Sequence, residues 1–268
     1  MKALKLTILG CGSSGGVPRI GNDWGVCDPE NPKNRRSRCG VHVEMSFEGD
    51  AEPLSLLIDT PPELREQLIR NEIGRVDGVL FTHDHADQTH GLDDIRVLAY
   101  NMRSQMPVYG NEETMRELTH RFRYCFTQLP GSPYPPIIKV DKIVEAYQPF
   151  SVGVGERAVE VLPVEQDHGS MRSFGFRIGD FAYCNDVVDL PEKSLKLLEG
   201  VKLFVVDALR YKPHPTHAHL EKSLKWIERI QPEQAILTNL HIDMDYETVS
   251  NETPDHVHVA YDGMVAYI

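Results

Sequence analysis

The chain has 268 residues, of which 40 are Asp or Glu and 28 are Lys or Arg, so its formal net charge is -12. Hydrophobic residues make up 41% and charged residues 25%, a composition typical of a globular protein with a sizeable core. The acidic balance argues against nucleic acid or an anionic membrane as a partner. No stretch approaches the roughly 20 apolar residues of a membrane-spanning helix.

The five cysteines are an odd number at scattered spacings, which argues against a disulfide framework and for a reducing compartment. The apolar run near the start, Leu6 to Leu9, is too short for the core of a signal peptide. We therefore expect a cytoplasmic protein.

Alternating apolar residues at positions 4, 6 and 8 predict a first strand, which runs into a glycine-rich loop over 10–18. Pro61 is placed to begin a helix that ends near Asn71, because proline is favoured in the first helical turn. Further strands are predicted at 41–47, 54–59 and 78–81.

The second part of the chain mixes both kinds of element without a linker. Helices are expected from about His90, and over 111–123, 191–198 and 218–230; strands are expected over 158–164, 173–178, 180–184, 203–207 and 235–237. This order predicts an α/β protein in which two mixed β-sheets pack face to face with helices outside, as an αββα sandwich in a single domain over 1–268.

The most informative motif is Thr82-His83-Asp84-His85-Ala86-Asp87-Gln88, directly after an apolar strand. A loop leaving a strand can aim both imidazoles and the Asp87 carboxylate at one point. Neutral imidazoles and carboxylates are ligands of divalent metals, and a bound metal activates water at neutral pH. The motif therefore predicts a metal-dependent enzyme.

This loop resembles the His-x-His-x-Asp-His motif of the metallo-β-lactamase superfamily, with Gln88 in place of the last histidine. The resemblance implies further ligands after later strands, which His168 and Asp186 match. A final histidine is expected after the strand ending Leu237-Thr238, where this chain has Asn239.

In the dinuclear members, the equivalents of His83, His85 and His168 hold one metal, and Asp186 bridges it to a second. Gln88 and Asn239 both replace ligands of the second metal, which Asp87 would also bind. The resemblance thus implies one strong site, for zinc or manganese, and a second that is weak, altered or absent. The two amides either fill space around a mononuclear site or complete an all-oxygen set for a hard ion. His241 is a candidate replacement ligand.

Further stretches, among them 9–18, Ile58-Asp59-Thr60-Pro61, 89–96 and 213–217, resemble the bacterial branch that includes the phosphoribosyl cyclic phosphodiesterase of phosphonate breakdown. The resemblance implies that His217 donates a proton to the leaving group or binds phosphate. It also implies that Asp59, His90 and His214 hydrogen-bond the ligand side chains. That enzyme has a structural zinc on closely spaced cysteines; with only Cys27 and the more distant Cys39 in this region, we expect none or an incomplete one.

We therefore expect a hydrolase of a small phosphodiester, possibly cyclic, in which a metal activates water, Asp87 orients or deprotonates that water and His217 protonates the leaving group. Arg35, Arg36 and Arg38 are candidates for binding the substrate phosphate, since guanidinium forks match phosphate oxygens. Two alternatives stay open: a catalytically silent ligand- or partner-binding protein of the same fold, and a nuclease of the tRNA 3′-processing type. Tyr134 would line the mouth of the site or contact a second copy in a homodimer.

Overall fold

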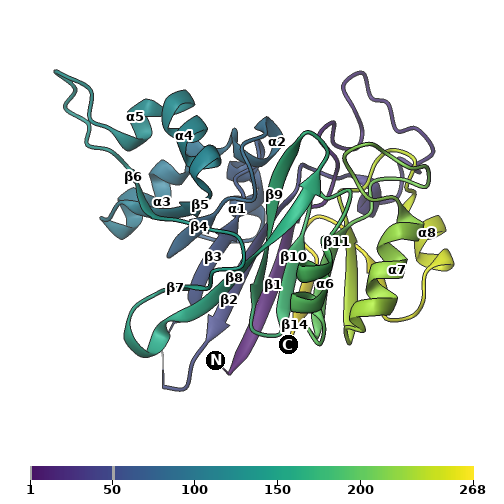
Figure 1. Cartoon of the computed structure of the whole chain (residues 1–268). Helices are drawn as coiled ribbons and strands as arrows, with labels where there is room; N and C mark the ends of the chain where they lie inside the picture. Colours follow the sequence, from purple (N-terminus) through teal and green to yellow (C-terminus); the bar gives the residue numbers. More distant parts are fainter. Residues whose placement is uncertain (1, 50–51) are drawn as a thin grey trace.

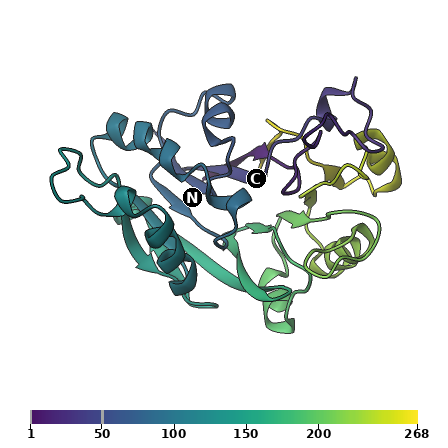
Figure 2. The ribbon, with the colours of Figure 1, turned by 90° about the horizontal axis from the view of Figure 1, so that it is seen from above.

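Two seven-stranded β-sheets pack face to face in the computed structural model, which describes residues 2–49 and 52–268 (Figure 1). The strand orders are β14-β1-β2-β3-β4-β5-β6 in the first sheet and β13-β12-β11-β10-β9-β8-β7 in the second. Seen from above, the dark indigo loop before β2 lies beside the yellow C-terminal part of the chain, where Asn34 donates to Asp245 (Figure 2).

Both sheets are mixed in the same way, with three antiparallel and three parallel pairings each. The strands of the first sheet are β1 (Ala3–Gly10), β2 (Gly40–Ser46), β3 (Leu54–Ile58), β4 (Gly78–Leu80), β5 (Met106–Gly110), β6 (Ile138–Ile143) and β14 (Val265–Tyr267). Those of the second are β7 (Phe150–Val152), β8 (Val159–His168), β9 (Met171–Ile178), β10 (Phe181–Cys184), β11 (Leu203–Asp207), β12 (Gln234–Thr238) and β13 (Val257–Val259).

Helices cover the outer face of each sheet. The α-helices are α1 (Leu64–Arg70), α2 (Ala86–Thr89), α3 (Ile95–Met102), α4 (Glu112–Arg121), α5 (Arg123–Phe126), α6 (Glu192–Leu198), α7 (Leu220–Ile230) and α8 (Tyr246–Glu252). Short 3₁₀ turns occur at Pro32–Asn34, Leu92–Asp94 and Gly155–Arg157.

Three buried clusters correspond to the three interfaces of the sandwich. One lies between the sheets and includes Leu6 and Phe176, whereas the other two join each sheet to its helices, as with Phe81 against Leu118 and Phe204 against Ile227. Alternate residues of a strand point to opposite faces, so a strand covered on both sides must be apolar throughout, as β3 is. The predicted αββα class is confirmed.

The sequence patterns missed several short elements and misplaced several boundaries, since the helix expected from Pro61 starts at Leu64 and the strand expected to end at Val164 continues to His168. Strands β5, β6, β7, β13 and β14 and helix α8 were not predicted; most are edge elements of three to seven residues whose pattern is too short to read. The helix expected from about His90 starts earlier as α2, is interrupted by a 3₁₀ turn and continues as α3. Within 2–49 and 52–268, no helix combines the length and apolar character needed to cross a bilayer.

Candidate metal centre

The predicted site residues meet where the carboxyl ends of strands from both sheets come together. Strand β4 leads into the histidine loop, His168 ends β8, Asp186 follows β10 and Asn239 follows β12. Strands β10, β11 and β12 are mutually parallel, so their last residues reach the same edge. Asp186 and Asn239 have left-handed backbones, with φ of 52° and 63°, which turn each chain sharply away from its strand.

Three imidazole rings, those of His83, His85 and His168, surround one point. Their centroids lie 4.5, 5.1 and 5.2 Å apart, and one ring nitrogen from each lies within 4.8 Å of the others. His168 and Asp186 also form a group of this kind with His217.

Hydrogen bonds fix which nitrogen of two of these rings faces the centre. The Thr82 hydroxyl donates to Asp59, so it accepts from His83 Nδ1 at 2.9 Å. His168 Nδ1 donates to the carbonyl of Thr216 at 2.8 Å. Neither Nε2 atom therefore carries a proton: His83 Nε2 is buried without a hydrogen-bond partner among the described residues, and His168 Nε2 lies 3.4 Å from Nδ1 of His85.

Burial keeps His83 and His168 neutral. Burial, reinforced by the neighbouring His168, His85 and His217, holds the pKa of His83 well below its usual value. Burial and the charge of His217 lower the pKa of His168 to about 4. Neutral imidazole is the form that binds a metal.

Acidic groups surround the same point. Burial raises the pKa of Asp186 well above its usual value; His217 opposes this, and Asp87, Asp207 and Asp59 add to it. A buried cluster of carboxylates needs a compensating cation. The inward lone pairs, the unpartnered His83 Nε2 and these acids together fit a divalent metal.

His217 is anchored by Asp207, a residue that the sequence analysis did not select. Its Nδ1 lies 2.9 Å from a carboxylate oxygen of Asp207, which also accepts the backbone N–H of Val187. Burial alone would lower the pKa of His217, but the charge and hydrogen bond of Asp207, with help from Asp186, raise it to about 9. With Nδ1 donating to Asp207, Nε2 is the nitrogen that can deliver a proton. Asp207 ends the apolar strand Leu203–Asp207, the same signal that identified Asp186.

The two amides in place of histidines both donate to Asp186. Gln88 Nε2 lies 2.8 Å from one carboxylate oxygen and Asn239 Nδ2 lies 3.3 Å from the other. Asn185 also donates to this carboxylate, at 2.8 Å. These amides therefore occupy, with N–H groups, the side of Asp186 that a second cation would take.

The other predicted residues divide into those near the site and those away from it. Asp59 accepts the backbone N–H and the hydroxyl of Thr82, so it supports the loop through Thr82, and burial raises its pKa to about 8. Asp87 is half-buried and lies outside the converging groups, although its charge acts on Asp59 and Asp186. The His214 ring packs 5.1 Å from that of His217 and accepts from Thr216.

His90 and His241 are not brought to the imidazole cluster. His90 is exposed and packs its ring edge-on to Phe122 at 6.0 Å. One ring nitrogen of His241 contacts Arg19 and the other lies 3.1 Å from Asp243, so it does not replace the missing ligand.

The three candidate arginines are engaged elsewhere. Arg35 stacks over Trp24, and Arg38 forms an ion pair with Glu63 at 2.7 Å. Arg36 is buried and donates to Asn34 and to the carbonyl of His241. None lines the cavity next to His217; all three line a neighbouring cavity of about 680 Å³, and their role in binding the substrate phosphate stays a prediction.

The sequence profile of the β-lactamase superfamily domain matches residues 55–242, which include all the converging ligands. The chain belongs to the β-lactamase superfamily. It is a hydrolase of the metallo-β-lactamase fold, a fold that implies binding of a divalent metal.

Solved structures agree with this membership. The chain is 33% identical to a diphosphatase from the PhnP family, with a TM-score of 0.86 over 99% of this chain and 97% of that one. Zinc-bound PqqB from Methylobacterium extorquens is 16% identical, with a TM-score of 0.71 over 98% and 99% of the two chains, and shares the fold. So does the short form of human tRNase Z, at 17% identity and a TM-score of 0.69 over 98% of each chain.

A curated relative from Porphyromonas gingivalis, named octanoyltransferase, is 30% identical over 270 residues. The match covers 99% of this chain but 52% of that protein, so the chain spans about half the length of the relative.

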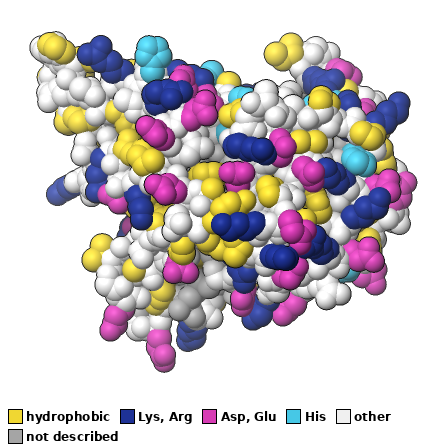
Figure 3. All heavy atoms as spheres, in the orientation of Figure 1, with side chains coloured by type: hydrophobic (Ala, Val, Ile, Leu, Met, Phe, Trp, Pro, Cys, Tyr) yellow, Lys and Arg dark blue, Asp and Glu magenta, His cyan; other side chains and the backbone are white. Residues whose placement is uncertain are grey.

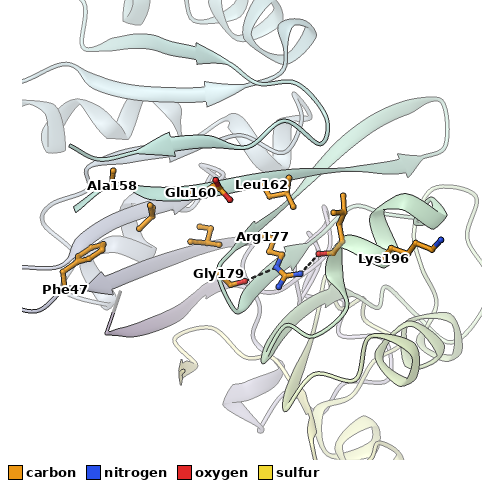
Figure 4. A pocket seen from close by; sticks show the side chains of 10 residues that line it. Phe47, Ala158, Glu160, Leu162, Arg177, Gly179 and Lys196 are labelled. Atoms are coloured by element: carbon orange, nitrogen blue, oxygen red, sulfur yellow. Dashed lines mark hydrogen bonds between the residues drawn. The ribbon is translucent and has the colours of Figure 1, made fainter. Parts of the chain in front are cut away.

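A second cavity, of about 580 Å³, lies away from this superfamily site. It is lined by Phe47, Leu162 and other mainly apolar residues, and none of the converging ligands borders it. Its Arg177 donates to the carbonyls of Gly179 and Leu197 (Figure 4). These bonds join the arginine to the end of α6.

Proposed function

We propose that the protein is a metal-dependent hydrolase of a small molecule with a phosphodiester or diphosphate linkage, binding zinc or manganese at one strong site. The observation that carries this proposal is the convergence of ring nitrogens from His83, His85 and His168, with Asp186 and His217 grouped around the same His168. Asp207 holds His217 in its charged form. The similarity to a PhnP-family diphosphatase supports a phosphorus-oxygen bond as the target.

His83, His85, His168 and Asp186 would hold the metal. When bound, a divalent metal polarises a phosphoryl oxygen and lowers the pKa of water. Asp87 accepts a proton from the attacking water, whose oxygen forms a bond to phosphorus. His217 Nε2 gives its proton to the leaving oxygen as the second phosphorus-oxygen bond breaks.

The hydrogen bond between His217 and Asp207 suits His217 to the role of proton donor. The carboxylate holds the ring in one orientation and keeps it charged at neutral pH, so a proton is available at Nε2. The reaction thus has its proton acceptor and its proton donor on different elements, α2 and the segment before α7.

The mononuclear arrangement is favoured over a second, hard-ion site. The N–H groups of Gln88 and Asn239 face Asp186, as hydrogen-bond donors rather than oxygen ligands. We propose further that the protein works in the reducing cytoplasm, since its five cysteines are unpaired and buried.

Small molecules remain our proposed substrates rather than nucleic acid. On the face shown in Figure 3, basic and acidic side chains are interspersed rather than gathered into a basic track. Tyr134 is 67% exposed on the loop before β6, and its role at a homodimer contact stays a prediction.

Replacing His83 by Ala should abolish metal binding and turnover together, because two of the three imidazoles cannot hold the ion alone. Metal content would be measured on purified protein, and hydrolysis followed with bis-p-nitrophenyl phosphate and Mn²⁺. The exposed His256 gives a matched control: His256→Ala should keep both properties.

A His83→Ala protein that retains both metal and activity would contradict the proposal. A wild-type protein that is fully loaded but hydrolyses neither phosphodiesters nor diphosphates would favour a silent binding protein instead.

A further inference from the structure

Gln88 has one polar atom that no residue of the described chain satisfies. Its side chain lies on α2 and is 1% exposed. Its Nε2 donates to Asp186 at 2.8 Å, whereas its Oε1 is buried without a hydrogen-bond partner within residues 2–49 and 52–268. Burying an amide oxygen without a donor is costly, so a donor from outside the chain is expected beside it.

The neighbours of Gln88 fix where this oxygen lies. If the amide were reversed, its oxygen would face the carboxylate of Asp186, and two acceptors would repel each other. The nitrogen and oxygen of an amide are about 2.2 Å apart, so Oε1 lies beside this carboxylate, at the metal centre. Thr60 donates its backbone N–H to the carbonyl of Gln88, whose own N–H donates to His85, so both backbone groups of Gln88 are held.

Asp87, the proposed proton acceptor, precedes Gln88 on the same helix. It is half-buried, and its charge acts on both Asp186 and His217. The Asp87 carboxylate and the Gln88 oxygen are therefore two acceptors beside one centre. A water molecule has two O–H groups, and donating one to each acceptor fixes the direction of the lone pair that attacks phosphorus.

We propose that Gln88 Oε1 accepts a hydrogen bond from the attacking water and orients it towards phosphorus, while Asp87 takes the other proton of that water. This inference rests on the proposed function and gives a role in the reaction to a residue that the superfamily pattern marks as a lost ligand. As the water oxygen forms its bond to phosphorus, one proton passes to Asp87 and the other stays on the product oxygen.

Methanol tests this role because it has a single O–H group. That group can donate to Asp87 but leaves the oxygen of Gln88 without a donor, so the wild type should favour water. In aqueous methanol, bis-p-nitrophenyl phosphate yields p-nitrophenyl phosphate from water and methyl p-nitrophenyl phosphate from methanol, and ³¹P NMR measures their ratio. Gln88→Met should raise the ratio of methyl ester to p-nitrophenyl phosphate about 2- to 10-fold, the effect of one ordinary hydrogen bond.

Asn185 provides a matched control for the lost contact with Asp186. Its Nδ2 donates to the same carboxylate oxygen as Gln88, also at 2.8 Å, and its side chain is buried. Asn185→Leu therefore removes an equivalent hydrogen bond and leaves the oxygen of Gln88 in place, so its product ratio should equal that of the wild type. A structural effect acting through Asp186 would change the ratio in both variants.

Fluoride binding gives a second measurement that needs no turnover. Fluoride takes the place of water at metal ions and carries no proton, so the oxygen of Gln88 opposes its binding. Calorimetry on the metal-loaded protein should show about 2- to 10-fold tighter fluoride binding in Gln88→Met, and no change in Asn185→Leu. Metal content should be the same in all three proteins, because Gln88 is not among the converging ligands.

Thermal melts check that each variant is folded, and Gln88→Leu replaces Gln88→Met if the latter is not. An unchanged product ratio in a folded Gln88 variant would overturn the proposal, even if the protein hydrolyses phosphodiesters. A changed ratio in Asn185→Leu would also overturn it, because the amide oxygen of Asn185 is unpartnered too. If the protein hydrolyses no phosphate ester, the proposed function fails, whereas fluoride binding that depends on Gln88 would still support the position of its oxygen.

Discussion

At the residue scale, the site depends on where each imidazole carries its proton. Thr82 and Thr216 accept from Nδ1 of His83 and His168, which leaves Nε2 of each ring unprotonated and able to bind a metal. A hydrogen bond at Nδ1 makes His217 a proton donor instead, because Asp207 accepts from Nδ1 and keeps the ring charged. Identical side chains thus acquire the roles of ligand and acid from one hydrogen-bond partner each.

Asp207→Asn should leave the metal in place and reduce kcat by about 10²- to 10⁴-fold, the usual contribution of general acid catalysis. The amide cannot hold the ring charged, so the proton on Nε2 is lost at neutral pH. Metal content and kcat would be measured on the same preparation. An unchanged kcat would show that His217 does not deliver the proton; the exposed Asp255→Asn serves as the control.

Substitution of Gln88 and Asn239 tests whether these two positions belong to a second metal site. Replacing both by His removes the N–H groups from Asp186 and adds two imidazoles beside Asp87. Metal content should then rise towards two per chain, measured by elemental analysis after dialysis against Zn²⁺ or Mn²⁺. If the content does not change, these positions do not belong to a second metal site.

At the scale of elements, the loops after the strands are fixed to one another rather than free. The backbone N–H of Thr60 donates to Gln88 and that of Gly91 donates to Thr60, so the loop after β3 is bonded to the C-terminal end of α2 and to the turn that follows it. Phe174 on β9 donates to the carbonyl of Thr82, which joins the histidine loop to the other sheet. Ligands from two sheets therefore share one rigid support.

Gly91→Ala should destabilise the protein by about 1–3 kcal/mol, the usual cost of overpacking. The added Cβ would lie 2.1 Å from the carbonyl oxygen of Pro61, so α2 must move away from the loop after β3. Urea denaturation measures the loss, and metal affinity should fall with it because Asp87 and Gln88 lie on α2. Gly74, with nothing within 4 Å of its added Cβ, is the control: Gly74→Ala should change stability little. Equal stability of the two variants would show that this contact is not tight.

At the scale of the whole molecule, stability depends on buried groups far from the metal centre. His42 on β2 is 3% exposed and donates from Nε2 to the hydroxyl of Ser55. That hydroxyl in turn donates to the backbone carbonyl of Arg75. Burial lowers its pKa to about 4, against the opposing effect of Glu44 and with a smaller contribution from Lys5. The folded protein therefore resists protonation of His42.

Between the ordinary pKa of 6.5 and about 4, the unfolded chain binds a proton that the folded chain does not. The free energy of unfolding should thus fall as the pH decreases through this window, by about 2 kcal/mol from pH 7 to pH 5 for this residue. The His42→Gln variant should lack the part of this decrease in the free energy of unfolding that His42 causes. Urea denaturation of metal-free wild type and variant at both pH values gives the comparison, and identical pH dependence would show that His42 does not contribute.

Sequence patterns predicted the αββα class and the candidate ligands because both can be recognised from residues that are close together in the sequence. An apolar run marks a strand buried on both faces, and a polar residue directly after it marks the edge where a site forms. The loop with His83 and His85 was found in this way, whereas His168, Asp186 and the replacement of two histidines by Gln88 and Asn239 were implied by the resemblance to the superfamily.

Which residues pair across the site was decided only by the tertiary structure. The hydrogen bond of His217 with Asp207 and the amides turned towards Asp186 join residues of distant loops and strands. The contacts of Arg35, Arg36 and Arg38 with Trp24, Asn34 and Glu63 could not be read from their local pattern either. The protonation and charge of a side chain depend on the neighbours that folding brings close to it. The distances to those neighbours cannot be read from the order of residues along the chain.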